Sequence, residues 1–233
     1  MKTNVTTVSV FGTLIKFGAD ALFVIQVIGG LGLIIPMMIR NWNNVEGVSL
    51  SYFLIIMASC GLQASLAISA HRAAPSRKSI QAIFVYIMWI VLVGLHTLEI
   101  VFRGMYVWDT NDMVTLSLTS MSALLVYLWR KRCGSDFNDL VTKSQISMMM
   151  RGIPQLLQGV KIAMVGGAGL PAISVIVGNA NIWIRITHLI LTRSEAKWER
   201  NRVWMLVSEV VNAVSWGVVS LIWIAWRIGI ITH

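Results

Sequence analysis

The sequence predicts an all-α membrane protein with seven transmembrane helices, arranged as two three-helix bundles joined by a linker helix. Three observations support this prediction: a composition poor in charge, seven apolar segments, and an internal repeat. Of the 233 residues, 56% are hydrophobic and 12% are charged, whereas soluble domains are about 25% charged. Most of the chain therefore lies where charge is energetically costly, and its length matches one compact membrane domain.

The apolar segments have the length that a bilayer requires, since a membrane-spanning helix needs about 20 mostly apolar residues. The candidate spans are residues 17–39, 50–70, 80–102, 113–129, 148–169, 171–191 and 203–226. The fifth is the weakest candidate, because it contains Arg151, Pro154 and Lys161.

The basic residues predict the orientation of these spans. With seven spans, the N-terminal tail shares one side with the loops that follow spans two, four and six. That side holds 14 of the 19 Lys and Arg residues: Lys2, Lys16, Arg72, Arg77, Lys78, Arg130, Lys131, Arg132, Lys143, Arg151, Arg193, Lys197, Arg200 and Arg202. The opposite side holds Arg40, Arg103, Lys161 and Arg227, and Arg185 lies within a span. Because cytoplasmic loops are enriched in Lys and Arg, we expect a cytoplasmic N-terminus and a C-terminus on the opposite side.

The net charge of +9 is distributed between the apolar runs instead of forming one patch. This pattern is typical of loops held at an anionic lipid surface. The expected partners are therefore the lipid bilayer and a small molecule, and not nucleic acid. The sequence does not decide whether the chain forms a homo-oligomer.

Two stretches of the chain match at a constant offset of 122 residues, which predicts an internal repeat. The aligned positions are Gly47-Val48-Ser49 with Gly169-Leu170-Pro171, Gly32 with Pro154, Ser59 with Asn181, and Gln63 with Arg185. We expect a first repeat over residues 1–106, a linker helix and loop over 107–146, and a second repeat over 147–233. Parallel repeats around a midplane site are a common transporter design.

The repeated segments resemble the two PQ-loop motifs of the SWEET and PQ-loop transporter superfamily. The second copy has Pro154-Gln155 followed by Gly169-Leu170-Pro171, and the first has Pro36-Met37 and then Asn44 to Ser49. Transporters of the nicotinamide riboside uptake type share the plan and are a plausible nearer relative. The resemblance implies a 3+1+3 fold and alternating-access transport of a small polar solute, such as a sugar, a vitamin or an amino-acid-like molecule, without a cofactor.

The resemblance also directs attention to the sixth span, where family members carry an Asn and, four residues later, a Trp. Without a gap, Asn181 matches the Asn and Arg185 replaces the Trp, whereas a two-residue shift matches Asn179 and Trp183. Asn212 corresponds to a family Asn that lines the central cavity. We expect Asn181, Arg185 and Asn212 to face a polar cavity, with Ser59 and Gln63 opposite them and Trp183 stacking on the substrate.

A charge inside a span costs several kcal/mol unless it faces a cavity or a partner. Arg185 therefore either contacts the substrate or forms a structural ion pair with Glu99 or Glu209. If it contacts the substrate, an anionic or strongly polar group is favoured over a plain sugar.

Two further sets of residues have predicted roles. Pro36 and Pro154 interrupt the backbone hydrogen bonds of their helices, so each is a candidate hinge. His96, Glu99 and Glu209 are the groups within the spans that are able to exchange protons near neutral pH, which makes them candidates for proton coupling.

Two other classes of function stay open. A seven-helix receptor or scaffold would bind a ligand or a partner without transport, although no Lys lies between Val203 and Arg227 to hold retinal. An intramembrane enzyme is less favoured, because the sequence has no His-Glu-x-x-His or Gly-x-Ser-x-Gly motif. We predict a transporter with no catalytic residues, metal ligands or cofactor.

Overall fold

A computed structural model describes residues 4–73, 75–104, 106, 108–191 and 200–231, and its regular structure is entirely helical. The described residues form seven helices: α1 (Asn4–Asn41), α2 (Leu50–Ala73), α3 (Arg77–Phe102), α4 (Thr110–Arg132), α5 (Leu140–Val165), α6 (Ala172–Leu191) and α7 (Arg200–Arg227). Three residues of the predicted basic side, Lys2, Arg193 and Lys197, lie outside the described residues. The all-α prediction is confirmed.

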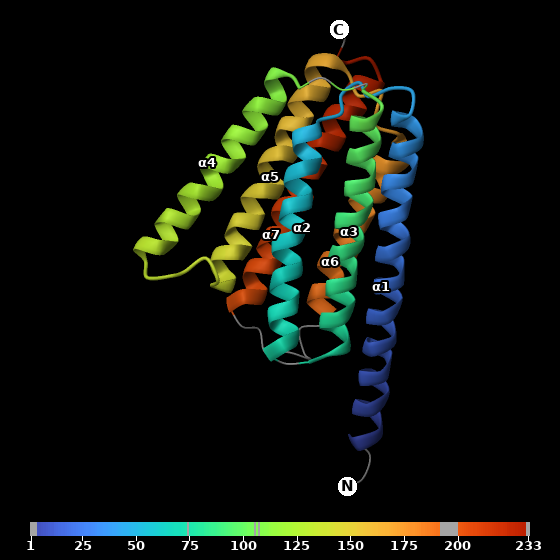
Figure 1. Ribbon diagram of the computed structural model, residues 1–233. Helices are drawn as coiled ribbons and strands as arrows, with labels where there is room; N and C mark the ends of the chain where they lie inside the picture. Colours follow the sequence, from blue (N-terminus) through green and yellow to red (C-terminus); the bar gives the residue numbers. More distant parts are fainter. Residues whose placement is uncertain (1–3, 74, 105, 107, 192–199, 232–233) are drawn as a thin grey trace.

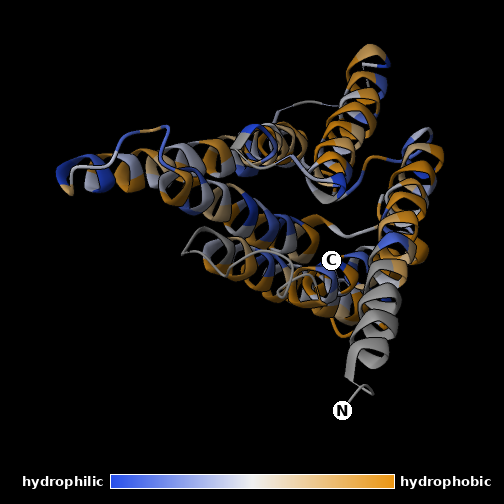
Figure 2. Ribbon diagram, turned by 90° about the horizontal axis from the view of Figure 1, so that it is seen from below, coloured by the Kyte–Doolittle hydropathy of each residue, from blue (hydrophilic) through white to orange (hydrophobic). Residues whose placement is uncertain are grey.

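Six of the helices contain segments long and apolar enough to cross a bilayer. These segments are Asp20–Asn41, Leu50–Arg72, Ser79–Phe102, Thr110–Arg132, Ala172–Leu191 and Val203–Arg227. Hydrophobic residues run along most of the length of the helices in Figure 2. The chain is therefore an integral, multi-pass membrane protein.

Helix α5 is long enough to span the membrane, but it is too polar to be recognised as a span by its hydropathy. It runs alongside α2, α4 and α7 (Figure 1) and packs against all three. Its polar residues Lys143, Arg151, Gln155, Gln158 and Lys161 are buried against protein. The helix begins at Leu140, earlier than residue 148 where the hydropathy of the sequence predicts it, because the buried first turns are polar.

Helix starts are stabilised by side-chain caps, which accept hydrogen bonds from otherwise unpaired backbone N–H groups. Ser49 accepts from the Tyr52 N–H (3.2 Å) at the start of α2. Ser76 and Asp109 form capping boxes at α3 and α4, and Asp139 caps α5. Burial alone would raise the pKa of Asp139, but hydrogen bonds from Arg130 and Thr142 lower it below its usual value.

The bundle has a regular pattern of helix contacts. Helix α3 packs against both α1 and α2, and α7 packs against both α5 and α6. Contacts of α1 with α6 and of α2 with α5 join these two groups, while α4 lies at the edge against α5 and α2. The two ends of the chain lie at opposite ends of the bundle (Figure 1). The end that carries the 1–2, 3–4 and 5–6 connections is called here the C-terminal end.

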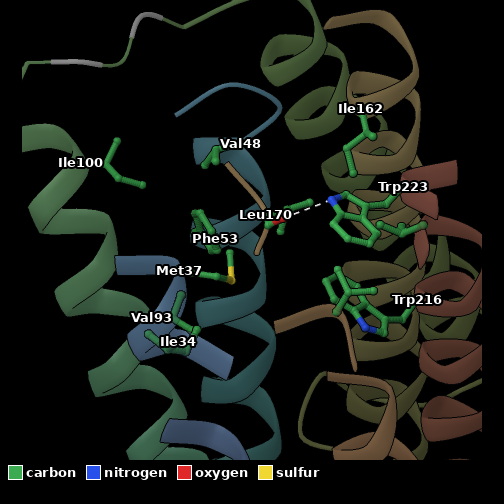
Figure 3. Close-up of a cluster of buried hydrophobic side chains, with 12 residues drawn as sticks. Ile34, Met37, Val48, Phe53, Val93, Ile100, Ile162, Leu170, Trp216 and Trp223 are labelled. Atoms are coloured by element: carbon green, nitrogen blue, oxygen red, sulfur yellow. Dashed lines mark hydrogen bonds between the residues drawn. The ribbon is translucent and has the colours of Figure 1, made fainter. Parts of the chain in front are cut away.

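The main hydrophobic core lies toward the C-terminal end and joins the two groups of helices. It includes Val48 and Leu170 from the 1–2 and 5–6 connections, Phe53 from α2, and Trp216 and Trp223 from α7. The indole Nε1 of Trp223 donates to the Leu170 carbonyl (3.1 Å), the dashed contact in Figure 3. The core thereby fixes both connections to the ends of the helices.

Candidate functional site

The 1–2 and 5–6 connections bind each other at the C-terminal end. The Gly169 N–H donates to the Glu46 carbonyl (2.9 Å), and Arg40 Nε donates to the Ala168 carbonyl (2.8 Å). Gln158 Nε2 donates to the Gly47 carbonyl. Gly47 has a φ of 73°, and a Cβ there would overlap the Gly166 carbonyl, while a Cβ at Gly169 would lie 2.7 Å from the Glu46 carbonyl oxygen. The two glycines, which the predicted repeat aligns, thus mark a close approach of the two connections.

Below this contact lies a cavity of about 120 Å³ between α1, α2, α3, α5, α6 and α7. Part of its wall is apolar and aromatic, and includes Val48, Tyr52, Phe53, Trp89, Leu170 and Trp216. Its polar wall includes Gln26, Arg151, Gln155, Asn181, Arg185, Glu209 and Asn212. Of the predicted site residues, Asn181, Arg185, Asn212 and Glu209 therefore lie together at this cavity.

One carboxylate and two guanidinium groups meet at the polar wall. Glu209 Oε1 lies 2.6 Å from Arg151 Nη1 and 2.7 Å from Arg185 Nε. The Arg185 guanidinium also lies over the ring of Tyr86, with 4.3 Å from its carbon to the ring centroid. Arg185 thus pairs with Glu209, one of its two predicted partners, and remains part of the cavity wall.

Ser59 and Gln63 lie behind this wall and not on it, which corrects the prediction that they face the cavity. Both side chains contact Ser147 of α5: Ser59 Oγ at 2.8 Å and Gln63 Nε2 at 2.9 Å. Ser59 also accepts a hydrogen bond from Arg151 Nε (3.2 Å), and Gln63 Oε1 accepts one from the Tyr86 hydroxyl (3.2 Å). Ser59 therefore holds Arg151 directly, and Gln63 holds Tyr86, over whose ring Arg185 lies.

Asn212 connects the ionic group to the Pro-Gln motif. Its Nδ2 donates to Glu209 Oε2 (3.3 Å), and its Oδ1 accepts from Gln155 Nε2 (2.6 Å). The Ser215 hydroxyl donates to Gln155 Oε1. This chain of hydrogen bonds fixes Gln155 and Asn212 at the cavity wall.

Trp183 is 59% exposed on the outer surface and does not line the cavity, so the structure does not bring it to the place where its stacking role was predicted. Asn179 of the same shifted alignment bonds Ser220 on α7 (2.7 Å). Only the gapless alignment brings its residues, Asn181 and Arg185, to the cavity. Trp216, a few turns into α7, is the buried tryptophan of the wall.

His96 and Glu99 form a separate polar pair near the C-terminal end. His96 Nδ1 lies 3.2 Å from Glu99 Oε2, and neither residue lines the cavity. The Asn41 amide oxygen accepts a hydrogen bond from His96 Nε2 (3.1 Å). The amide nitrogen of Asn41 donates to the carbonyls of Gly169 (2.8 Å) and Asn44 (2.9 Å). Of the three proton-coupling candidates, only Glu209 therefore lies at the cavity.

The predicted hinge prolines, Pro36 and Pro154, each lie inside a continuous helix, in α1 and α5. Pro154 is buried beside the cavity residue Gln155. Their hinge role stays a prediction.

Reasoning from the sequence missed Arg151 as a cavity residue, because it assigned this arginine to the basic loop side. Arg151 is only 6% exposed and Lys143 9% exposed, both on α5. Lys161 of the opposite side is buried on the same helix, so without these three residues 12 basic residues remain on the basic side against three on the other, and the asymmetry persists. The spacing of Arg151 and Gln155, one helical turn apart, was the available signal.

Comparisons of this chain with protein-family models, curated proteins and solved structures found no match.

Proposed function

We propose that the protein is a membrane transporter that moves a small polar organic solute by alternating access about the central cavity. The observation that carries this proposal is the cavity itself, a mixed polar and aromatic space within the bundle that is covered at one end by the bound 1–2 and 5–6 connections. Alternating access requires a contact that closes the site on one side of the membrane and can separate to open it, and the contact between the two connections has this position. The many hydrogen bonds across the two connections form one discrete closed arrangement.

The helix contacts support a 3+1+3 plan of the kind found in the SWEET and PQ-loop superfamily. Exchanging α1, α2 and α3 with α5, α6 and α7 turns the α1–α6 contact into the α5–α2 contact, and both are present. The same exchange maps the contacts of α3 onto those of α7. The exchange also relates two close approaches. Gly47 lies close to Gly166, and Gly169 lies close to Glu46, which is within a few residues of the position that the exchange predicts. Helix α4 is then the linker.

If the protein transports by alternating access, a cross-link between the 1–2 and 5–6 connections should stop solute uptake. In a variant with Cys60→Ser and Cys133→Ser, new cysteines replace Arg40 and Ala168. These two residues are close, because Arg40 Nε lies 2.8 Å from the Ala168 carbonyl oxygen. We expect a bifunctional thiol reagent to abolish solute uptake into proteoliposomes and a cleavable version to restore it after reduction. The solute is first selected by a thermal-shift screen of sugars, amino acids, nucleosides, vitamins and carboxylates.

The single-cysteine variants treated in the same way are the controls, since each binds the reagent at one point. Uptake that persists in the cross-linked protein contradicts alternating access through this end. A solute that binds and stabilises the protein without ever entering the vesicles indicates a receptor or scaffold instead.

The positive-inside asymmetry predicts that the N-terminus and Cys133 face the cytoplasm. Cys133 is exposed at the end of α4, while Cys60 is buried. In the Cys60→Ser variant, we expect a membrane-impermeant maleimide to label Cys133 only after the cells are permeabilised. Ile230→Cys in a background without other cysteines is the matched control, because Ile230 is 73% exposed beyond α7, and it should label in intact cells. The reverse pattern would show that the orientation is inverted.

A further inference from the structure

The cavity wall carries more positive than negative charge. Among its lining residues that the structure describes, the ionised side chains are Arg151, Arg185 and Glu209. An arginine does not lose its proton in a protein, so the wall has one positive charge that no carboxylate balances. Such a charge inside a membrane domain is costly unless a partner neutralises it.

The geometry makes Arg185 the guanidinium most available to a ligand. Arg151 is held on two sides, by Glu209 through Nη1 and by Ser59 through Nε. Arg185 meets Glu209 through Nε, lies over the ring of Tyr86, and is more exposed, at 17% against 7% for the Arg151 side chain. A guanidinium binds a carboxylate with two parallel N–H groups, and Arg185 can present its terminal edge while Nε stays on Glu209.

Unpaired polar atoms give a second and independent indication of a ligand. Buried atoms without a hydrogen-bond partner in the described part of the chain include Gln26 Nε2, Gln158 Oε1, Asn181 Oδ1 and Trp216 Nε1. All four belong to residues that line the cavity. Each unpaired group in a native interior costs free energy and requires an explanation. Asn181 Oδ1 and Trp216 Nε1 lie against Gly29 and Gly178, so a ligand with acceptor and donor groups would satisfy these atoms after the side chains turn toward the cavity.

The size and the remaining wall restrict the ligand further. One water occupies about 10–15 Å³ of such space, so 120 Å³ corresponds to roughly ten atoms of that size. Tyr52, Phe53, Tyr86, Trp89 and Trp216 surround this space with aromatic rings. Aromatic walls favour a flat ring through offset or edge-to-face contacts.

We infer that the solute is a small aromatic monocarboxylate, whose carboxylate binds Arg185 beside Arg151 and whose ring lies among Trp89, Trp216 and Phe53. A hydroxyl or ring N–H on the solute would bond the amide oxygen of Asn181 once this amide turns from Gly29 toward the cavity. This inference rests on the proposed function for its site, and it adds the charge and the shape of the solute.

The test compares anionic ligands with neutral ligands of the same shape. Benzoate and salicylate are measured against benzamide and salicylamide by isothermal calorimetry and thermal shift on the full chain in detergent. We expect the carboxylates to bind at least tenfold more tightly than their amides, and salicylate more tightly than benzoate. Arg185→Gln should weaken carboxylate binding at least tenfold, whereas Arg77→Gln, at the far end of α3, should leave it unchanged.

Three results would overturn the inference: equal binding of acids and amides, no carboxylate binding up to millimolar concentrations, or binding that ignores Arg185→Gln. Competition on the wild-type protein gives a readout that needs no variant. Displacement of benzoate by benzamide at the concentration at which salicylate displaces it would also contradict the inference. Transport is judged separately. Benzoate that binds through Arg185 but does not enter proteoliposomes refutes transport alone, and uptake of a neutral solute without carboxylate binding refutes the anionic solute alone.

Discussion

The variant Glu209→Gln is expected to lose more stability than any other single change at the cavity. Glu209 is 3% exposed and is the shared partner of Arg151 and Arg185. Its removal leaves the buried Arg151 and the half-buried Arg185 close together without a counter-charge. Breaking a buried ion pair by removing one partner costs about 3–5 kcal/mol. Thermal unfolding of the purified protein, followed by tryptophan fluorescence, measures the loss.

The matched variant Arg185→Gln should be much less destabilising, because the contact of 2.6 Å between Arg151 and Glu209 remains and the charges balance. The double variant should be more stable than the sum of the single effects predicts, since one of the two opposed cations is gone. If Arg185→Gln unfolds the protein as readily as Glu209→Gln does, the arginine is a structural ion-pair partner. The argument for an anionic solute would then lose its basis.

The sequence predicted the helices well because hydrophobicity acts on whole segments. Six apolar segments of about 20 residues are visible without knowing their neighbours, and the structure has a helix at each one. Helix α5 was predicted to start too late, since a helix packed against three others needs an apolar surface only on its exposed face. Its first turns contain Thr142, Lys143, Ser144 and Gln145, all buried, and hydropathy alone excludes such residues from a span.

The candidate site was predicted in part, for a similar reason. A polar residue inside an apolar span must face protein or a cavity, which correctly brought Asn181, Arg185 and Asn212 to one place. The same rule does not distinguish a cavity from a neighbouring helix. Ser59 and Gln63 satisfy it by bonding Ser147, a residue of the helix whose start was predicted too late. Trp183 needed no such partner and faces outward.

The variant Gly47→Ala is expected to separate the 1–2 and 5–6 connections. Gly47 has a φ of 73°, where an alanine is strained by about 1–2 kcal/mol. The added Cβ also overlaps the carbonyl oxygen of Gly166, a backbone atom that no side-chain rotation moves. The chain must therefore shift, which weakens the bonds from Gln158 to Gly47 and from Gly169 to Glu46. We expect a large fall in the unfolding temperature.

Gly104→Ala separates the two causes of this effect. Gly104 has a similar φ of 60°, but nothing lies within 4 Å of an added Cβ, so this variant reports the backbone strain alone. If the close approach of the two connections closes the cavity, Gly47→Ala should be clearly less stable than Gly104→Ala. It should also expose Cys60, a cavity residue, to thiol reagents in a background that lacks Cys133. Equal stability of the two variants, with Cys60 still protected, would show that the two connections do not form the closure.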